Sequence, residues 1–328
     1  MIKDIFKFVE NNNVLFITTK NIDYIRNSQE INILQNKTAS LKILGFKDKK
    51  YFSRLLKLFI KILFLPFDEF DVIFIGFSPQ LILPFWYYRF RKKIVIVDFF
   101  ISLHDTFVFD RQKVHDKSIV GNFLYYLDRK TLVNATYIVT DCVAHAKFFS
   151  SEYSIPINKM GILYLEADTT VYYPRPQVKV PPFYGKYVVN YFGSILNLQG
   201  IEIILQAAYI LKDNHEILFD IIGPVKKRDY KFKNIIFTTW LSQDDLASRI
   251  ALADLCLAGH FNAEIAKASR TIPGKAFIYE AMGKPMILGD NPANHEQFLE
   301  DNRHYFVKMG NAEVLAKKIM EIKNHKCF

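Results

Sequence analysis

Short apolar runs alternate with longer segments of helical periodicity along the whole chain. In the first half, β-branched and aromatic runs with charge only at their ends predict buried strands at 13–19, 71–77, 93–100 and 135–141. Segments with helical periodicity, 51–65 and 118–132, lie between them. This alternation is typical of a parallel sheet with helices on both faces.

The second half repeats the pattern. Apolar runs predict strands at 187–193, 216–223, 234–240, 252–259 and 284–290, with helical segments at 201–212 and 242–251. Between the halves, the proline-rich segment 171–187 reads as an extended connector. We therefore expect an α/β chain of two doubly wound, Rossmann-like domains, 1–175 and 176–328. A cleft between the carboxyl edges of the two sheets would bind ligands.

The charge of the chain is basic and unevenly placed. The formal net charge is +10, and residues 1–175 hold 24 Lys and Arg against 17 Asp and Glu, leaving 19 against 16 for the remainder. Such an excess suits nucleic acid, an anionic membrane surface or phosphorylated substrates. Because the chain has no Arg/Gly-rich tail, zinc-finger spacing or RNA-binding signature, we expect no nucleic-acid partner.

Two segments of the first half combine apolar and cationic residues. RLLKLFIKILFLPF (54–67) is too short and too charged to span a bilayer. It is either a helix packed on the sheet or a helix in a membrane interface with its lysines directed towards lipid phosphates. FWYYRFRKK (85–93) fits the second reading as well.

The cysteines and the N-terminus bear on localisation. Cys142, Cys256 and Cys327 are far apart and form no CxxC, so neither a disulfide framework nor a zinc site is expected and a reducing compartment is the simplest reading. The N-terminus has charges within its short apolar run and no small-residue cleavage site, so we expect no secretory signal. These features predict a cytoplasmic protein, peripheral on the inner face of the cell membrane.

In the second half, the candidate chemistry is anion binding at helix starts. Gly193 ends a predicted strand and Gly200 opens a helix, but no GxGxxG or GxxxxGK[ST] occurs, so nicotinamide dehydrogenases and P-loop NTPases lose their main support. In RTIPGKAFIYEAMGKPMILGD (270–290), a helix begins at Pro273-Gly274 with Lys275 in its first turn. A cation opposes the helix dipole there unless an anion arrives, so Lys275 and Arg270 are candidates for binding a diphosphate.

In the first half, FFISLHDTFVFDR (99–111) follows a predicted strand that ends at Asp98. It is either a solvated loop or part of a site at the carboxyl edge of the sheet. No Asp-x-Asp occurs in the chain, which argues against a metal-held nucleotide sugar, and we expect no metal or cofactor. His145 is expected to be structural. The segment carries five polar or ionisable candidates: Ser102, His104, Asp105, Asp110 and Arg111.

These motifs, in this order and spacing, resemble the GT-B glycosyltransferases, particularly the large family four of retaining enzymes. In the second half the matching pieces are YFGSILNLQGIEIILQA, FDIIGP, WLSQDDLASRIALADLCLAG and TIPGKAFIYEAMGKPMILGDNPANHE. In the first half they are DVIFIGFSPQLILP, DFFISLHDTFVFDR, LDRKTLVNATYIVTDCVAHAKFF and ADTTVYYP, which resemble the acceptor domain of a bacterial subgroup. The resemblance covers nearly the whole chain.

The chain departs from that family at four positions. Many members have an Arg after the first glycine and a Lys before the second, both serving the donor diphosphate, where this chain has Ser194 and Gln199. The family's paired glutamates, the second of which usually holds the donor ribose, fall on Arg270 and Ile278. Glu280 lies about 200° further round the helix and would not simply substitute. Either the helix register differs locally, or ribose is held another way, or donor binding has been lost.

The resemblance implies transfer of a sugar from a nucleotide-diphosphate sugar to a saccharide or lipid-linked acceptor in a bacterial polysaccharide or glycolipid pathway, retaining and without a metal. Two alternatives stay open: an inactive glycosyltransferase-like partner subunit, and a sugar-nucleotide epimerase of the same fold. The donor would lie against Gly193, Ser194, Gln199, Arg270, Gly274, Lys275 and Glu280. Asp98, His104 and Asp105 would orient the acceptor hydroxyl, and Ser102 and Arg111 would contact the acceptor.

Overall fold

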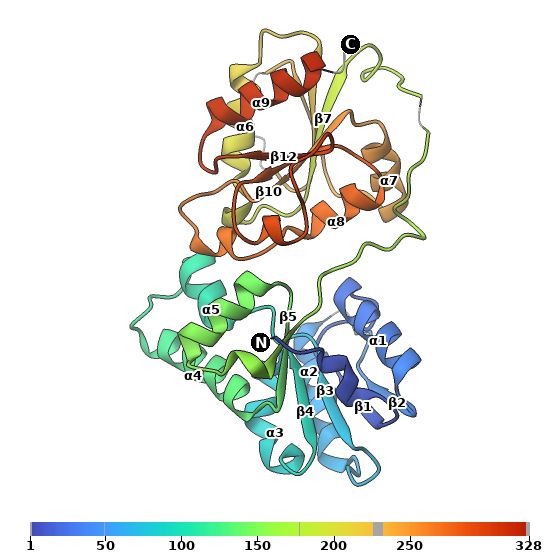
Figure 1. Ribbon diagram of the computed structural model, residues 1–328, viewed down its shortest axis with the longest axis vertical. Coiled ribbons are helices and arrows are strands. Elements are labelled where there is room, and N and C mark those ends of the chain that lie inside the picture. Colours follow the sequence, from blue (N-terminus) through green and yellow to red (C-terminus); the bar gives the residue numbers. More distant parts are fainter. Residues whose placement is uncertain (1, 49, 177, 226–231, 326–328) are drawn as a thin grey trace. The chain divides into compact units, whose positions relative to one another are not determined.

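The computed structural model describes residues 2–48, 50–176, 178–225 and 232–325. The chain divides into two units, Met1–Leu165 and Glu166–Phe328, so the division falls ten residues before the expected 175/176. Each unit is a parallel six-stranded sheet with helices on both faces (Figure 1). Cys327 lies outside the described residues.

The first domain has the strand order β2-β1-β3-β4-β5-β6. Its strands are β1 (Asn13–Ile17), β2 (Ser40–Leu44), β3 (Val72–Ile75), β4 (Ile94–Asp98), β5 (Tyr137–Thr140) and β6 (Met160–Ile162). Its α-helices are α1 (Ile25–Lys37), α2 (Tyr51–Phe64), α3 (Leu83–Phe90), α4 (Ile119–Asn134) and α5 (Val143–Tyr153). Shorter helical turns are η1 (Ile5–Val9), η2 (Pro79–Leu81), the π-helix η3 (Asp105–Asp110) and η4 (Ile157–Lys159).

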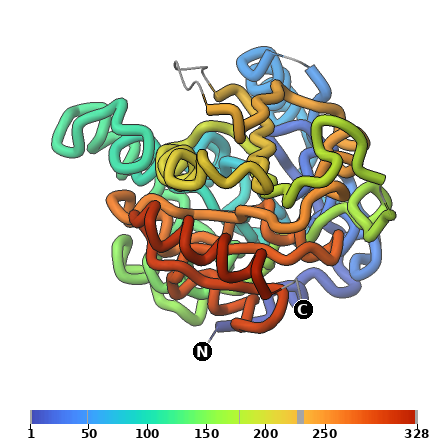
Figure 2. The backbone as a smooth tube through the Cα atoms, turned by 90° about the horizontal axis from the view of Figure 1, so that it is seen from above, coloured from blue at the N-terminus to red at the C-terminus, as the bar shows by residue number. Residues whose placement is uncertain are grey.

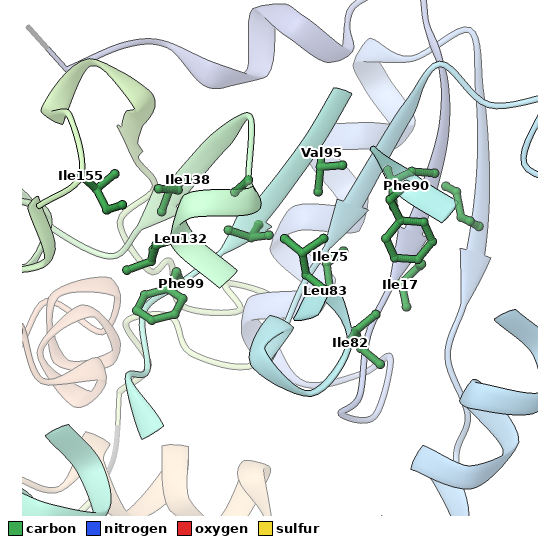
Figure 3. Close-up of a cluster of buried hydrophobic side chains, with 14 of the residues drawn as sticks. Ile17, Ile75, Ile82, Leu83, Phe90, Val95, Phe99, Leu132, Ile138 and Ile155 are labelled. Atoms are coloured by element: carbon green, nitrogen blue, oxygen red, sulfur yellow. The ribbon is translucent and has the colours of Figure 1, made fainter. Parts of the chain in front are cut away.

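The strands are apolar on both sides because each face of the sheet packs against helices. Along β1, Leu15 and Ile17 belong to one buried cluster, whereas Val14 and Phe16 belong to the cluster on the opposite face. The larger cluster also takes in side chains from β3, β4 and β5 and from α3 and α4 (Figure 3). Since alternate residues enter different cores, the register of each strand is well determined.

The second domain has the strand order β12-β11-β10-β7-β8-β9. Its strands are β7 (Tyr187–Phe192), β8 (Ile217–Ile222), β9 (Ile235–Thr238), β10 (Leu255–Gly259), β11 (Met286–Gly289) and β12 (His304–Val307). Its α-helices are α6 (Ile201–Ile210), α7 (Gln243–Ala251), α8 (Gly274–Ala281) and α9 (Ala312–His325). Shorter turns are η5 (Asn197–Gln199), η6 (Ala266–Ser269) and η7 (Asn294–Glu296). Helix α9, dark red in Figure 2, packs beside α6 on one face of the sheet.

Each sheet has one point where the chain reverses its direction of winding. This switch point lies between β1 and β3 in the first domain and between β7 and β10 in the second. Open α/β sheets bind ligands beyond the carboxyl ends of the strands at such points. We therefore expect a ligand site of the second domain at the loops after β7 and β10.

All nine predicted strands are present, and the two-domain α/β prediction is confirmed. Three strands were missed. β2 is half-exposed and polar in alternate positions, β6 has only three residues, and β12 has four and begins with His304. β2, β6 and β12 are three of the four edge strands of the described sheets, where burial imposes the weakest apolar pattern, and the fourth, β9, was predicted.

Candidate functional site

The carboxyl edge of the second sheet is lined by glycines. Four neighbouring strands, β11, β10, β7 and β8, end in or just before Gly289, Gly259, Gly193 and Gly223. A Cβ atom on Gly223 would lie 2.2 Å from the carbonyl oxygen of Gly193, and one on Gly289 would lie 2.1 Å from that of His260. Because only glycine allows this approach, the backbones at the edge pack directly against one another.

Lys275 lies buried at this edge, in the first turn of α8. Its Nζ donates to Oε1 of Gln199 at 2.9 Å and lies 3.8 Å from the ring centroid of Tyr191. A Cβ on Gly193 would lie only 3.1 Å from the same Nζ. The predicted helix start at Gly274 is confirmed, and it directs the lysine to the switch point between β7 and β10.

The environment of Lys275 is made of neutral groups. Burial lowers the pKa of Lys275 well below its usual value, and it is the single cause of the shift within the described part of the chain. An ammonium in such a place is stabilised only by the Gln199 oxygen and the aromatic face of Tyr191. The described neighbours of Lys275 therefore offer a positive charge at Nζ only neutral partners.

Gln199 is held in place from both sides. Its Oε1 also accepts a hydrogen bond from the Tyr191 hydroxyl, and its backbone oxygen accepts from the amide of Phe261 at 3.2 Å. Gly200, with φ of +68°, turns the chain from η5 into α6, where a Cβ would lie 2.7 Å from the amide nitrogen of Asn262. The loop after β7 is thus packed against the loop after β10.

His260 is a third member of this cluster and escaped sequence reasoning. It is buried directly after β10, with Nδ1 3.5 Å from the hydroxyl of Thr271. Burial, followed by the positive charge of Lys275, lowers the pKa of His260 to about 3. The imidazole is therefore neutral at physiological pH and adds no charge to the site.

Three other donor candidates, Gly193, Ser194 and Arg270, lie in different surroundings. The amide of Gly193 donates to the carbonyl oxygen of Ile222 at 3.0 Å, as a member of the sheet ladder, so we leave it out of the donor site. Ser194 is half-buried and its carbonyl accepts from the amide of Leu196. Arg270 directly follows η6, with its side chain half-buried.

Glu280 points away from Lys275. Its Oε2 lies 2.6 Å from Nε2 of His304 and its Oε1 lies 3.4 Å from the guanidinium of Arg303. His304 begins β12, so this pair lies at the amino edge of the sheet, opposite the glycine-lined edge. Ile278 packs against the apolar cluster beneath α8. We therefore leave Glu280 out of the donor site as well.

In the first domain, Asp98 is committed to a buried ion pair. Its carboxylate accepts from Nε and Nη2 of Arg26, at 3.1 and 2.8 Å, and both side chains are almost fully buried. Glu30, one turn further along α1, is also buried, and burial together with the charge of Asp98 raises the pKa of Glu30 well above its usual value. Asp98 thus fixes α1 to the end of β4, and we leave it out of the acceptor site.

The segment after β4 is organised by a buried aspartate that sequence reasoning missed. Oδ1 of Asp128, on α4, accepts from Nε2 of Gln80 (2.9 Å) and the amide of Leu103 (3.0 Å). Oδ2 accepts from the amide of His104 (2.8 Å) and the hydroxyls of Ser102 (2.7 Å) and Tyr153 (3.2 Å). Within LDRKTL, Asp128 looked like a surface helix residue, and nothing local distinguishes it.

Of the acceptor candidates, His104 is the best placed for chemistry. Its Nε2 lies 3.0 Å from Oδ1 of the half-exposed Asp116, while its ring packs edge-on against Phe109 and Tyr125. Asp105 begins η3 and is buried with Asp110.

The remaining first-domain candidates have structural or surface places. Ser102 caps the turn through the amide of Asp105 at 2.9 Å. Arg111 is exposed, 5.5 Å from the ring centroid of Phe107. His145, expected to be structural, is buried and pairs with Asp141 at 2.6 Å. Among the described residues, no group of three or more His, Cys, Asp or Glu side chains is placed to hold a metal ion.

Comparison with known proteins is informative at this point. Residues 186–325 match the family Glycosyl transferases group 1. No curated protein matches the chain. Among solved structures, it is similar to sucrose-phosphate synthase from Thermosynechococcus elongatus (TM-score 0.67, 11% identity, 95% of this chain and 90% of that one). It is also similar to HepE from Anabaena in complex with UDP (0.66, 11%, 96% and 90%) and to a glycosyltransferase from Rickettsia africae (0.64, 11%, 96% and 89%).

The match to the group 1 glycosyltransferases thus covers most of the second domain. The likeness to the solved structures shows the GT-B fold over nearly the whole chain. The predictions of a GT-B architecture and of a nucleotide-sugar glycosyltransferase are therefore confirmed.

In this domain, three of the four departures noted in the sequence have distinct surroundings. Gln199 accepts a hydrogen bond from the buried Lys275, Ser194 lies half-buried beside Gly193, and the half-buried Ile278 packs against an apolar cluster. An amine thus lies at the switch point, contributed by the first turn of α8, and the loop after β7 contributes the neutral Gln199.

Proposed function

We propose that the second domain binds a nucleotide-diphosphate sugar with its diphosphate at Lys275, and that the enzyme transfers the sugar to a saccharide or lipid-linked saccharide. The observation that carries this proposal is the buried, uncompensated amine at the carboxyl edge of the sheet. A diphosphate would supply the anion that burial of the amine lacks. HepE, which has the same fold, has been solved with UDP and with UDP-glucose.

The chemical role of Lys275 follows from where negative charge develops during transfer of the sugar. Departure of the nucleotide diphosphate from the anomeric carbon leaves negative charge on the phosphate oxygens. A preorganised cation in a site shielded from water stabilises that charge strongly. Arg270, which precedes α8 by a few residues, is the second candidate for this task. We propose transfer with retention and without a metal, in which the donor phosphate accepts the proton of the acceptor hydroxyl.

On the acceptor side, we propose that His104 orients the acceptor hydroxyl with Asp105 beside it. The imidazole is fixed by ring packing and by Asp116, and the backbone amide of His104 is fixed by Asp128. Orientation of this kind lowers the barrier by avoiding loss of freedom during the reaction.

We further propose that the first domain contacts an anionic membrane surface at the cytoplasmic face. Along α2, the residues Phe52, Leu56, Ile60 and Leu63 are each at least half exposed and fall on one stripe of the helix. Exposed Lys57 and Lys61 flank that stripe, with Lys57 paired to Asp48. An exposed apolar stripe bordered by cations is the pattern of an interfacial helix.

Helix α3 extends this surface. Arg89 donates to the backbone oxygens of Leu63 and Leu65, which ties α3 to the end of α2. Phe85 and Tyr88 are exposed, and Arg91 stacks on Tyr88 at 5.2 Å. None of the described helices is long and apolar enough to cross a bilayer.

The donor proposal is tested by thermal stabilisation with UDP, GDP, dTDP and CMP compounds. We expect one nucleotide to raise the Tm of the wild type and of Lys317→Ala, an exposed-lysine control on α9, but not of Lys275→Ala. Absence of a response to all nucleotides would contradict the proposal and favour an inactive partner subunit.

The membrane proposal has its own test. In liposome flotation, the wild type should float with anionic vesicles, and the double variant Phe52→Ser/Phe64→Ser should not. Leu299→Ser is the matched control, since Leu299 in the second domain is as exposed as Phe64, at 76%. Equal recovery of the double variant and the control would refute the proposed surface.

A further inference from the structure

The groups around Nζ of Lys275 form a cage that can hold either a neutral amine or an ammonium. Its three walls are the ring of Tyr191, the side-chain oxygen of Gln199 and the backbone of Gly193. Lys275 is only 6% exposed. A carboxamide oxygen accepts a hydrogen bond from a neutral amine and from an ammonium alike. The cage therefore holds the nitrogen in the same place in both protonation states.

The titratable groups that face the cage are neutral or positive. From β7, Tyr191 stays protonated because burial raises its pKa, and Tyr279 on α8 does so for the same reason. From the loop after β10, His260 is neutral, with its pKa lowered to about 3 by burial and by Lys275. Lys267 on η6 also acts on His260 with positive charge.

The resulting balance favours the neutral amine in the unliganded domain. The Gln199 oxygen and the Tyr191 ring attract a positive charge only as a dipole and a ring quadrupole, and burial removes the water that would otherwise solvate an ammonium. A diphosphate introduces negative charge within the same shielded space, which stabilises the ammonium. The anion and the proton thus favour each other's binding.

We propose that binding of the donor diphosphate is coupled to uptake of a proton by Nζ of Lys275, with Gln199 as the positioning residue. The inference rests on the proposed function of the second domain. The proton comes from solvent, adds to the lone pair of the amine, and leaves the hydrogen bond to Gln199 in place. By linkage, nucleotide-sugar affinity falls as pH rises, by about tenfold per pH unit where uptake is complete.

Calorimetric titration tests this coupling. UDP-glucose and GDP-glucose are suitable probes because their diphosphates are esterified at both ends and lack the terminal phosphate that ionises at a pKa near 6. Titrations just above neutral pH, in buffers of different ionisation enthalpy, give the number of protons taken up. We expect about one proton for the wild type and for the control Lys317→Met, with a Kd that rises with pH.

Variants separate the coupling from a purely structural effect. Lys275→Met should fold, bind more weakly, take up no proton and show a Kd independent of pH. Gln199→Glu places a carboxylate in the cage, which keeps Lys275 charged before ligand arrives, so uptake should fall to near zero. Gln199→Met should retain uptake, because the cage remains uncharged.

The outcomes distinguish the two proposals. If no nucleotide sugar binds the wild type, the proposed function fails and the inference with it. If one binds with no net uptake of protons, or if Lys275→Met takes up as many protons as the wild type, the inference is overturned while the proposed function stands.

Discussion

Replacement of Asp128 by asparagine should destabilise the first domain through one backbone group. The amides of Leu103 and His104 donate to different oxygens of Asp128, at 3.0 and 2.8 Å. An asparagine keeps only one oxygen, so in either orientation of its amide one of the two buried N–H groups loses its acceptor. The three side-chain donors to Asp128 can rotate or flip to compensate, but a backbone amide cannot.

The expected loss of stability follows from the one backbone amide that is left without an acceptor. A buried donor left without an acceptor costs about 1–3 kcal/mol, and the surviving bonds weaken because their acceptor is no longer charged. Against this, the variant no longer buries a carboxylate, and burial is the main cause that raises the pKa of Asp128. We expect the free energy of unfolding to fall by about 2 kcal/mol.

Urea denaturation gives the free energy of unfolding, and hydrogen exchange locates the effect. The amides of residues 103 and 104 should exchange faster in Asp128→Asn, whereas those of β4 should change little. Asp68→Asn is the control, since it removes the same charge from an exposed site. An unchanged denaturation midpoint together with unchanged exchange at 103 and 104 would refute the argued role of Asp128.

Three further predictions concern the second domain. Gly223→Ala should lower the free energy of unfolding by more than about 2 kcal/mol, because a Cβ would lie 2.2 Å from a carbonyl oxygen. Gly185→Ala is the control and should cost about 1 kcal/mol, since Gly185 has a φ of +69° but no atom within 4 Å of the added Cβ. Equal effects of the two variants in denaturation would contradict this reasoning. Folding lowers the pKa of Lys275, so burial of this lysine destabilises the fold. The destabilisation is fully present below the folded pKa and is lost as pH rises towards the unfolded value near 10.5. Lys275→Met should therefore raise the Tm of the unliganded protein more at neutral than at alkaline pH. His304→Ala should reduce stability by about 1–3 kcal/mol, because it removes a buried ring that pairs with Glu280 and packs against Phe298, and it should leave nucleotide affinity unchanged. A large loss of affinity in titration would return Glu280 to the donor site.

Much of the fold could be predicted because burial on both faces of a parallel sheet leaves an uninterrupted apolar run. The strands that were missed lie at sheet edges, where β2 alternates and β12 opens with a histidine that pairs with Glu280. That pairing depends on the register of β11 with β12 and is not visible in either segment alone.

The candidate site was predictable only in part. The helix start at Gly274 and the lysine after it follow from local rules of helix initiation. The burial of Lys275 and its bond to Gln199, 76 residues earlier, depend on the placement of β10 beside β7. Asp128 shows the same limit, because a carboxylate that gathers five donors looks in sequence like any polar residue of a helix.

The structure also bears on whether the departures from the family pattern mean a loss of donor binding. A lysine at position 199 would place an ammonium where Oε1 of Gln199 now lies, 2.9 Å from Nζ of Lys275. Two like charges so close together in a buried site repel strongly, so without a bound anion only one of the two positions would hold a charge. We infer that Gln199 is the partner that a buried Lys275 requires, rather than the mark of a lost site. The amine at the switch point comes from the first turn of α8, and the loop after β7 contributes the neutral Gln199.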